Sequence, residues 1–155
     1  LGGETALMED GHVRQFGKTA EVYRNPISLT ASQIFSDPPI NSAKVEKRGS
    51  QIFLQDIFWE SPTKFRELTD GAYRIAIRPH HVFPEMQGDY TVPIVGKVGV
   101  TEISGSDSSA HFDFAGNGWV SLAQGVHPYT RGNEHTFYIN PNECLFFTLD
   151  GKRAA

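Results

Sequence analysis

The segment Tyr73-Arg74-Ile75-Ala76-Ile77-Arg78-Pro79-His80-His81-Val82 stands at the turning point of the chain. Its first five residues alternate from face to face, which predicts a short β-strand with Tyr73, Ile75 and Ile77 on one side. The Arg78-Pro79 pair ends this strand, because proline has no amide hydrogen for a sheet and disfavours helix at the residue before it. We therefore expect a helical and hairpin-rich part before this segment and a run of short strands after it.

The N-terminal residues 1–39 begin with the pattern of a β-hairpin. Asp10-Gly11 lies between two alternating runs, 5–9 and 12–16. An Asp-Gly pair in this position favours a two-residue turn, because both turn positions need positive φ.

Two short helices are expected after the hairpin. Thr19 is the predicted N-cap of the first helix, and Asn25-Pro26 stops it. Ser28 is the predicted N-cap of the second helix, over 29–35, since a Ser side chain can accept from a free amide of the first turn. The Asp37-Pro38-Pro39 sequence ends this helix and predicts a domain boundary.

From residue 40 onward the sequence is typical of short strands separated by turns rich in Gly, Asn, Asp and Ser. The expected strands are 43–47, 51–55, 73–77, 92–101, 110–114, 119–122, 136–139 and 145–149, with a short helical turn from Ser61 to Leu68. Gly96 and Gly99 inside a strand mark bulges or bends, as when a sheet curls into a barrel. The predicted fold is mainly β, with a small OB-like Greek-key barrel.

The composition limits the classes of function. The chain has 155 residues, of which 39% are hydrophobic, and a net charge of −4. The negative charge gives no electrostatic basis for nucleic-acid binding, which favours a basic stripe. No apolar run in the sequence approaches the roughly 20 residues of a membrane span. The single Cys144 excludes an internal disulfide and a thiolate zinc site, and it fits a reducing compartment such as the cytoplasm.

The stretch from Gly11 to Thr19 has some features of a phosphate-binding loop but the wrong spacing. The motif G-x-x-x-x-G-K-[ST] places four residues between its glycines, whereas five separate Gly11 from Gly17. Such a loop must curl its amides around one phosphate, and bulky Gln15 and Phe16 fit poorly in it. We therefore expect no nucleotide site here.

The sequence predicts neither a metal centre nor a catalytic nucleophile. His80 and His81 are expected to point to opposite faces of an extended segment, so they could not hold one ion together. No G-x-S-x-G motif is present, and Ser104–Ser109 has the composition of a hairpin loop. Glu102, beside this loop, is expected to bond a loop amide.

Several N-terminal segments resemble, in order, the sugar-type ABC-transporter ATPases of the maltose and glycerol-3-phosphate importer subfamily. Residues 6–17 (ALMEDGHVRQFG) resemble the last hairpin of the nucleotide-binding domain, and Glu21–Pro26 resembles its "EIYxxP" helix. Ile34–Asn41 resembles "FIGxPPMN", where that domain hands over to the regulatory domain. Here Ser36-Asp37 replaces the family's Gly-Ser.

The C-terminal segments continue the resemblance. Ile77-Arg78-Pro79 is similar to the "GIRPE" stretch that opens the transport-associated OB (TOBE, MOP-like) half, although His80 replaces the family's Glu. Val100–Ser106 resembles "VEPLGSE". Residues 140–153 resemble the closing "DPERVHLFDxxTGxRL".

This resemblance implies that residues 1–39 end a nucleotide-binding domain and that 40–155 form a regulatory TOBE domain. The chain would then be the regulatory and dimerisation region of the ATPase subunit of an importer for sugars or related solutes. The subunit would be cytoplasmic, peripheral on the inner face of the membrane. The sequence has no P-loop, LSGGQ-type signature, Walker-B carboxylates or switch histidine. We therefore expect the chain by itself to be inactive and to bind no cofactor, with ATP and Mg²⁺ only in a full-length parent.

The implied partners are a second copy of the chain, membrane permease subunits and a regulatory protein, but neither nucleic acid nor the lipid interior. A small barrel can bury strand edges and aromatic side chains against a twofold mate. The residues predicted for this regulatory or dimer surface are Arg78, Pro79, His80, His81, Glu102, Gly105, Ser106 and Asp107.

An alternative interpretation is a stand-alone OB-type module that binds a small oxyanion or a sugar. Such a site would use backbone amides, serines and a lysine around the loop Ser104–Ser109. Lys97 is the nearby lysine in the sequence.

Overall fold

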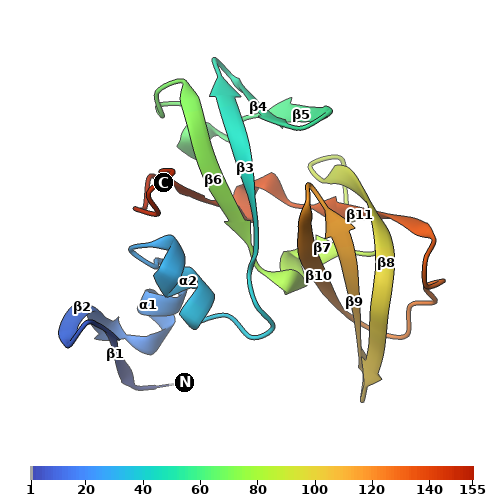
Figure 1. Ribbon diagram of the computed structural model, residues 1–155, viewed down its shortest axis with the longest axis horizontal. Helices are drawn as coiled ribbons and strands as arrows, with labels where there is room; N and C mark the ends of the chain where they lie inside the picture. Colours follow the sequence, from blue (N-terminus) through green and yellow to red (C-terminus); the bar gives the residue numbers. More distant parts are fainter. Residues whose placement is uncertain (1) are drawn as a thin grey trace.

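The computed structural model describes residues 2–155 as a mainly β protein (Figure 1). Its strands form an N-terminal two-stranded hairpin and two five-stranded antiparallel sheets. The predicted fold class is therefore confirmed, and the barrel-like sheet is the second of the two, which is nearly closed.

The N-terminal hairpin forms where the Asp-Gly pair predicts it. The hairpin and helices are β1 (Glu4–Glu9), β2 (His12–Lys18), α1 (Thr19–Arg24) and α2 (Leu29–Ile34). Asp10 and Gly11 have φ values of 51° and 75°, which are the positive angles that such a turn requires.

One predicted helix cap is confirmed and the other is wrong. The Ser28 hydroxyl accepts a hydrogen bond from the Ala31 amide at 3.1 Å, so Ser28 is the N-cap of α2. The N-cap of α1 is Lys18, and Thr19 is already helical. The Thr19 hydroxyl donates to the Gly3 carbonyl at 3.0 Å instead, because the hairpin brings that carbonyl beside it.

The first five-stranded sheet has the order β12-β6-β3-β4-β5. These strands are β3 (Asn41–Arg48), β4 (Gln51–Leu54), β5 (Ile57–Glu60), β6 (Gly71–Ile77) and β12 (Leu145–Phe147), and the 3-10 helix η1 (Thr63–Phe65) follows β5. β6 ends directly before Arg78, as the proline predicts. β5 was not expected from the sequence; a turn with Gln55 at a φ of 51° makes it pair with β4.

The second sheet has the order β10-β9-β8-β11-β7, and β10 lies beside β7, so that the sheet is nearly closed. Its elements are η2 (Pro79–His81), β7 (Val82–Phe83), β8 (Val92–Ser104), β9 (Asp107–Phe114), β10 (Asn117–Gln124), β11 (Glu134–Ile139) and η3 (Pro141–Glu143). The register of β8 against β9 shifts between Val98 and Thr101. The predicted irregularity at Gly99 therefore lies at this bulge.

One hydrophobic core joins the two sheets. It contains Ile52 and Ile75 of the first sheet together with Phe112 and Trp119 of the second. Buried polar bonds cross the same boundary: the Asn41 amide group donates to the Val120 carbonyl at 2.8 Å and accepts from the Val120 amide at 2.6 Å. The sheets therefore pack as one body.

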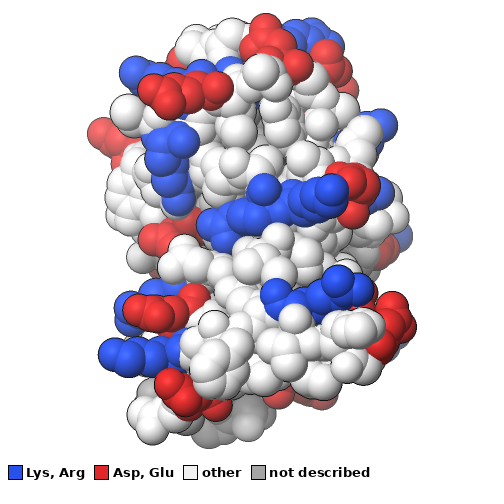
Figure 2. Space-filling model, turned by 90° about the vertical axis from the view of Figure 1, so that its left-hand side faces the viewer, with Lys and Arg blue, Asp and Glu red and all other residues white. Residues whose placement is uncertain are grey.

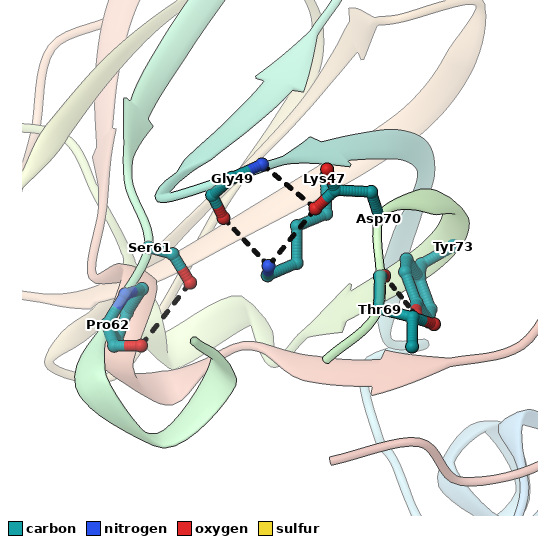
Figure 3. Close-up of polar contacts among 7 residues, drawn as sticks. All are labelled: Lys47, Gly49, Ser61, Pro62, Thr69, Asp70 and Tyr73. Carbon is teal, nitrogen blue, oxygen red and sulfur yellow. Dashed lines mark hydrogen bonds and ion pairs between the residues drawn. The ribbon is translucent and has the colours of Figure 1, made fainter. Parts of the chain in front are cut away.

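A buried lysine ties the start of β6 to the β3–β4 turn (Figure 3). The Lys47 side chain is only 2% exposed, and its Nζ donates to the Gly49 carbonyl at 2.7 Å. Nζ also lies 3.6 Å from a carboxylate oxygen of Asp70, and this oxygen accepts from the Gly49 amide at 2.9 Å. A buried charge is costly unless its partners stay in place, so these bonds hold the β3–β4 turn in one conformation.

The helices pack against the end of the chain, which Figure 1 shows as the red tail above α1 and α2. The Leu29 amide donates to the Gly151 carbonyl at 2.8 Å. Arg153 donates from its backbone amide to Ile27 and from Nη1 to the Pro26 carbonyl, both at 3.0 Å. These contacts fix the N-terminal part on the first sheet, while the division into domains at residue 39 stays a prediction.

Candidate regulatory surface and junction cleft

Arg78 turns inward at the end of β6. Its side chain is 7% exposed, and its guanidinium carbon lies 3.6 Å from the centroid of the Tyr23 ring. Nη2 donates to the Tyr23 carbonyl, whereas Nη1 is buried and has no hydrogen-bond partner among residues 2–155. Burial lowers the pKa of Arg78, although a guanidinium stays charged in proteins.

The prediction that His80 and His81 point to opposite faces is wrong. The segment is the 3-10 turn η2 rather than extended chain, and the two rings lie 4.1 Å apart. His81 Nε2 is 3.8 Å from a carboxylate oxygen of Glu143. Burial lowers the pKa of both histidines, and a neighbouring positive charge adds to this, from Arg78 on His80 and from His80 on His81.

A cleft of about 410 Å³ opens where these residues meet α1 and the C-terminal tail. We call it the junction cleft. Its charged lining residues are Arg24, Lys64, Arg78, Arg153 and Glu143, and both histidines also border it. The cleft is therefore predominantly cationic.

A second cleft, of about 430 Å³, also borders His80. It is lined by the segment after β7 and by the end of β10, including Pro84, Gln124 and His127. Gln124 pairs with Asp107 across the β9–β10 ladder. β10 is thus the element that links the η2 region to the other predicted group.

Glu102, Gly105, Ser106 and Asp107 lie at the tip of the β8–β9 hairpin. Gly105 has a φ of 60°, and the Ser106 carbonyl accepts from the Gly125 amide at 2.6 Å. The expected bond from Glu102 to a loop amide is wrong: Glu102 pairs with Ser109 in the ladder, and its exposed carboxylate makes no hydrogen bond to the described residues.

In the loop of the alternative oxyanion site, the Ser108 hydroxyl is already hydrogen-bonded within the protein. Ser108 is 1% exposed, its hydroxyl donates to the Gly125 carbonyl, and it accepts from the His127 amide at 3.3 Å. Lys97 lies in mid-strand on β8, paired with Asp113 of β9, rather than at the hairpin tip. The predicted groups of that site are therefore not gathered around the loop.

The eight predicted surface residues thus divide between η2 and the hairpin tip, and their regulatory or dimer role stays a prediction. Sequence reasoning missed Tyr23, Lys64, Glu143 and Arg153, which complete the junction cleft. They lie far apart in the sequence, so no spacing could have revealed them. The resemblance at the C-terminal "TGxRL" stretch was the available signal for Arg153.

Two general features bear on the kind of site. In the part of the chain that the structure describes, no three His, Cys, Asp or Glu side chains are arranged to hold a metal ion. No helix of residues 2–155 has the length and apolar composition to cross a bilayer.

Comparison with known proteins gives relatives of one kind. The chain is 24% identical over 160 residues to the maltose/maltodextrin import ATP-binding protein MalK of Photorhabdus laumondii, covering 97% of this chain and 43% of that protein. It is 28% identical over 114 residues to the sn-glycerol-3-phosphate import ATP-binding protein UgpC of Escherichia coli, covering 72% of this chain and 32% of that protein. The chain is similar to import ATP-binding proteins for maltose/maltodextrin and for sn-glycerol-3-phosphate.

The predicted resemblance is therefore confirmed. A MalK from Mannheimia succiniciproducens gives a similar match, 27% identical over 164 residues, with 97% of this chain and 43% of that protein covered. The chain spans less than half the length of these curated relatives. No family model matches the chain.

Proposed function

We propose that this chain is the regulatory and dimerisation region of the ATP-binding subunit of an ABC importer for sugars or related solutes. The observation that carries the proposal is the alignment of 97% of the chain with 43% of an import ATP-binding protein. The order of the hairpin, the two helices and the OB-like sheet supports it, because it follows the order of the resembling motifs. In this role the chain is cytoplasmic and associates with membrane permease subunits and a regulatory protein.

We further propose that the chain by itself does not hydrolyse ATP. Phosphoryl transfer needs a phosphate cradle, metal ligands and a group that positions water, all in one site. The sequence offers only the misspaced Gly11–Thr19 stretch, and this stretch lies in a β-hairpin and a helix start. We expect the purified protein with Mg²⁺ and ATP to release phosphate no faster than a heat-denatured sample. Turnover that exceeds this control and survives further purification would refute the proposal.

The hairpin tip of β8 and β9 is the surface that we propose for dimerisation. β8 exposes the apolar residues Val100 and Ile103 beside the polar residues of the predicted surface, with exposed fractions of 54% and 62%. A second copy of the chain would bury these side chains, as isologous interfaces do with one patch on both subunits.

The oligomeric state tests this surface directly. We expect sedimentation to give a dimer for the unmodified chain and a monomer for Ile103→Glu, since a charge in the core of an interface is poorly tolerated. Met86→Glu is the matched control, because Met86 is similarly exposed, at 57%, but lies outside β8 and β9. A dimer that survives Ile103→Glu but not Met86→Glu would place the interface elsewhere.

A further inference from the structure

The junction cleft concentrates positive charge in a chain whose net charge is −4. Four cationic side chains line it, Arg24, Lys64, Arg78 and Arg153, against the single carboxylate of Glu143. Figure 2 shows the face that carries α1 and the C-terminus, where Lys and Arg side chains form bands across the middle of the molecule. Within residues 2–155, none of the four cations forms an ion pair with an acidic residue.

Three of these cations contact neutral groups instead. Lys64 Nζ donates to the Asn142 carbonyl, and Arg78 Nη2 donates to the Tyr23 carbonyl. Arg153 donates from Nη1 to the Pro26 carbonyl at 3.0 Å, and its Nε donates at 2.8 Å to an oxygen of Ala155, the last residue of the chain. Backbone carbonyls satisfy individual N–H groups but do not neutralise a charge, so the field of the cations converges on the cleft.

Arg78 supplies the observation that points to a ligand. It is more than nine-tenths buried and borders the cleft, yet Nη1 has no acceptor among the described residues. Buried donors are almost always paired, because an unmet N–H loses its hydrogen bonds to water without replacement. The ring nitrogen Nδ1 of His81, which also borders the cleft, is likewise buried and without a hydrogen-bond partner among residues 2–155. An acceptor-rich ligand in the cleft would satisfy the Arg78 donor.

We propose that the junction cleft binds a small organic phosphate, with Lys64, Arg78 and Arg153 as its cationic ligands. A phosphate monoester carries close to two negative charges and three acceptor oxygens, which suits cations that approach from different elements. Arg78 Nη1 can donate to one of these oxygens, while Nη2 stays bonded to the Tyr23 carbonyl. A volume of about 410 Å³ is typical of small-molecule sites, so an organic group fits beside the phosphate.

The lining also supplies neutral groups for the organic part. The ring of Tyr23 and the side chain of Leu145 offer apolar surface, while Asn25 and Asn142 offer amide groups. Mixed apolar and polar linings of this kind fix the orientation of small ligands. This inference concerns ligand binding alone, so it holds or fails independently of the proposed transport role.

Titration calorimetry on the full chain tests the proposal, with inorganic phosphate and glycerol 2-phosphate as probes at constant ionic strength. We expect both probes to bind, the organic one more tightly, while acetate and chloride give no heat of binding. If neither phosphate binds at millimolar concentration, the proposal is overturned.

Two charge-neutral variants locate the site. Lys64→Gln should weaken binding about tenfold, because a hydrogen bond to a charged group is lost. Lys97→Gln is the matched control: Lys97 is an exposed lysine on β8, outside the cleft, and belongs to the alternative loop site. If Lys64→Gln binds the phosphate as tightly as the unmodified chain does, or if Lys97→Gln binds it more weakly, the anion binds elsewhere.

Amide chemical shifts of the unmodified chain give a test that does not depend on the folding of any variant. We expect glycerol 2-phosphate to shift the amide signals of residues 23–25, 80–81 and 142–145. Shifts confined to residues 104–109 would overturn the proposal in favour of the hairpin loop.

Discussion

The two buried cations Lys47 and Arg78 are held in different ways. Lys47 has a carboxylate within 3.6 Å and a carbonyl at 2.7 Å, so its charge is matched inside the chain. Arg78 lies against an aromatic ring and donates to a carbonyl, and its Nη1 has no partner among residues 2–155. Lys47 is therefore a stabilising residue, whereas the unmatched charge of Arg78 is available to a ligand.

The Lys47–Asp70 pair leads to a prediction about stability. Asp70→Ala leaves the buried ammonium with one neutral acceptor, so we expect the free energy of unfolding to fall by about 1–3 kcal/mol. Lys47→Met removes the buried charge and therefore its need for a partner. We expect this variant to lower the free energy of unfolding less than Asp70→Ala does. Urea unfolding measures both, with exposed Asp89→Ala as the control. A larger loss for Lys47→Met than for Asp70→Ala would contradict this account.

We expect His80 and His81 to make the free energy of unfolding depend on pH. Burial lowers the pKa of both in the folded chain, whereas the unfolded chain has ordinary values of about 6.5. As the pH falls below that value, the unfolded chain takes up protons that the folded chain does not, so the free energy of unfolding decreases. The charge of Arg78 opposes protonation of both rings, and Glu143 favours it.

We expect the double variant His80→Gln with His81→Gln to lose less stability than the unmodified chain between about pH 7.5 and about pH 5.5. Urea unfolding at both pH values measures this loss, and His12→Gln, on the exposed surface of β2, is the control. An equal loss in the double variant and the unmodified chain would show that other groups set the dependence.

At the scale of elements, β8 depends on two glycines for different reasons. A Cβ atom at Gly96 would lie 2.3 Å from Phe112 Cδ2 and 2.9 Å from the Asp113 carbonyl oxygen. At Gly99 the nearest atom, the His111 carbonyl oxygen, would be at an ordinary 3.5 Å. Gly96 thus allows the close approach of β9, while Gly99 lies at the bulge.

Alanine substitutions separate these two roles. We expect Gly96→Ala to lower the free energy of unfolding by about 1–3 kcal/mol, because the added methyl group overpacks the core. Gly99→Ala should lower the free energy of unfolding clearly less. Denaturant unfolding of the two variants side by side decides the matter, and an equal cost would mean that backbone freedom rather than space governs β8.

Local chemistry explains which elements the sequence could predict. Three features depend only on neighbouring residues and can therefore be predicted from the sequence: the Asp10-Gly11 turn, the Ser28 cap and the end of β6 before Pro79. β5 depends on pairing with β4 across a turn in which Gln55, not glycine, takes positive φ. Nothing in its local pattern required that turn.

The candidate site was only partly predictable for the same reason. Arg78 and the histidines follow from the strand end at Pro79, and they do border a cleft. Lys64 and Arg153 arrive there through tertiary packing of η1 and the C-terminal tail. The second predicted group, from Glu102 to Asp107, is distant from η2 in the sequence, and β10, which pairs with β9 and lines the second cleft beside His80, lies between the two groups.

At the scale of the whole molecule, the two sheets share one core although their strands form separate hydrogen-bonded ladders. Core residues of both sheets form one cluster, and Trp119 Nε1 donates to the Ser42 carbonyl of the other sheet at 3.1 Å. A shared core makes partial unfolding costly, since opening one sheet exposes apolar surface of the other. We therefore expect a single cooperative unfolding unit.

The two tryptophans test this cooperativity because each sheet holds one. Trp59 lies on β5 and Trp119 on β10, and both are buried. In Trp119→Phe and Trp59→Phe, the remaining tryptophan reports on its own sheet, while circular dichroism reports on the whole chain. We expect the fluorescence and dichroism midpoints in urea to coincide within each variant, as two-state unfolding requires. Asn41→Ala, which removes the bonds to Val120, should lower both midpoints together. A Trp59 transition that precedes the dichroism midpoint would instead mean that the first sheet opens while the second stays folded.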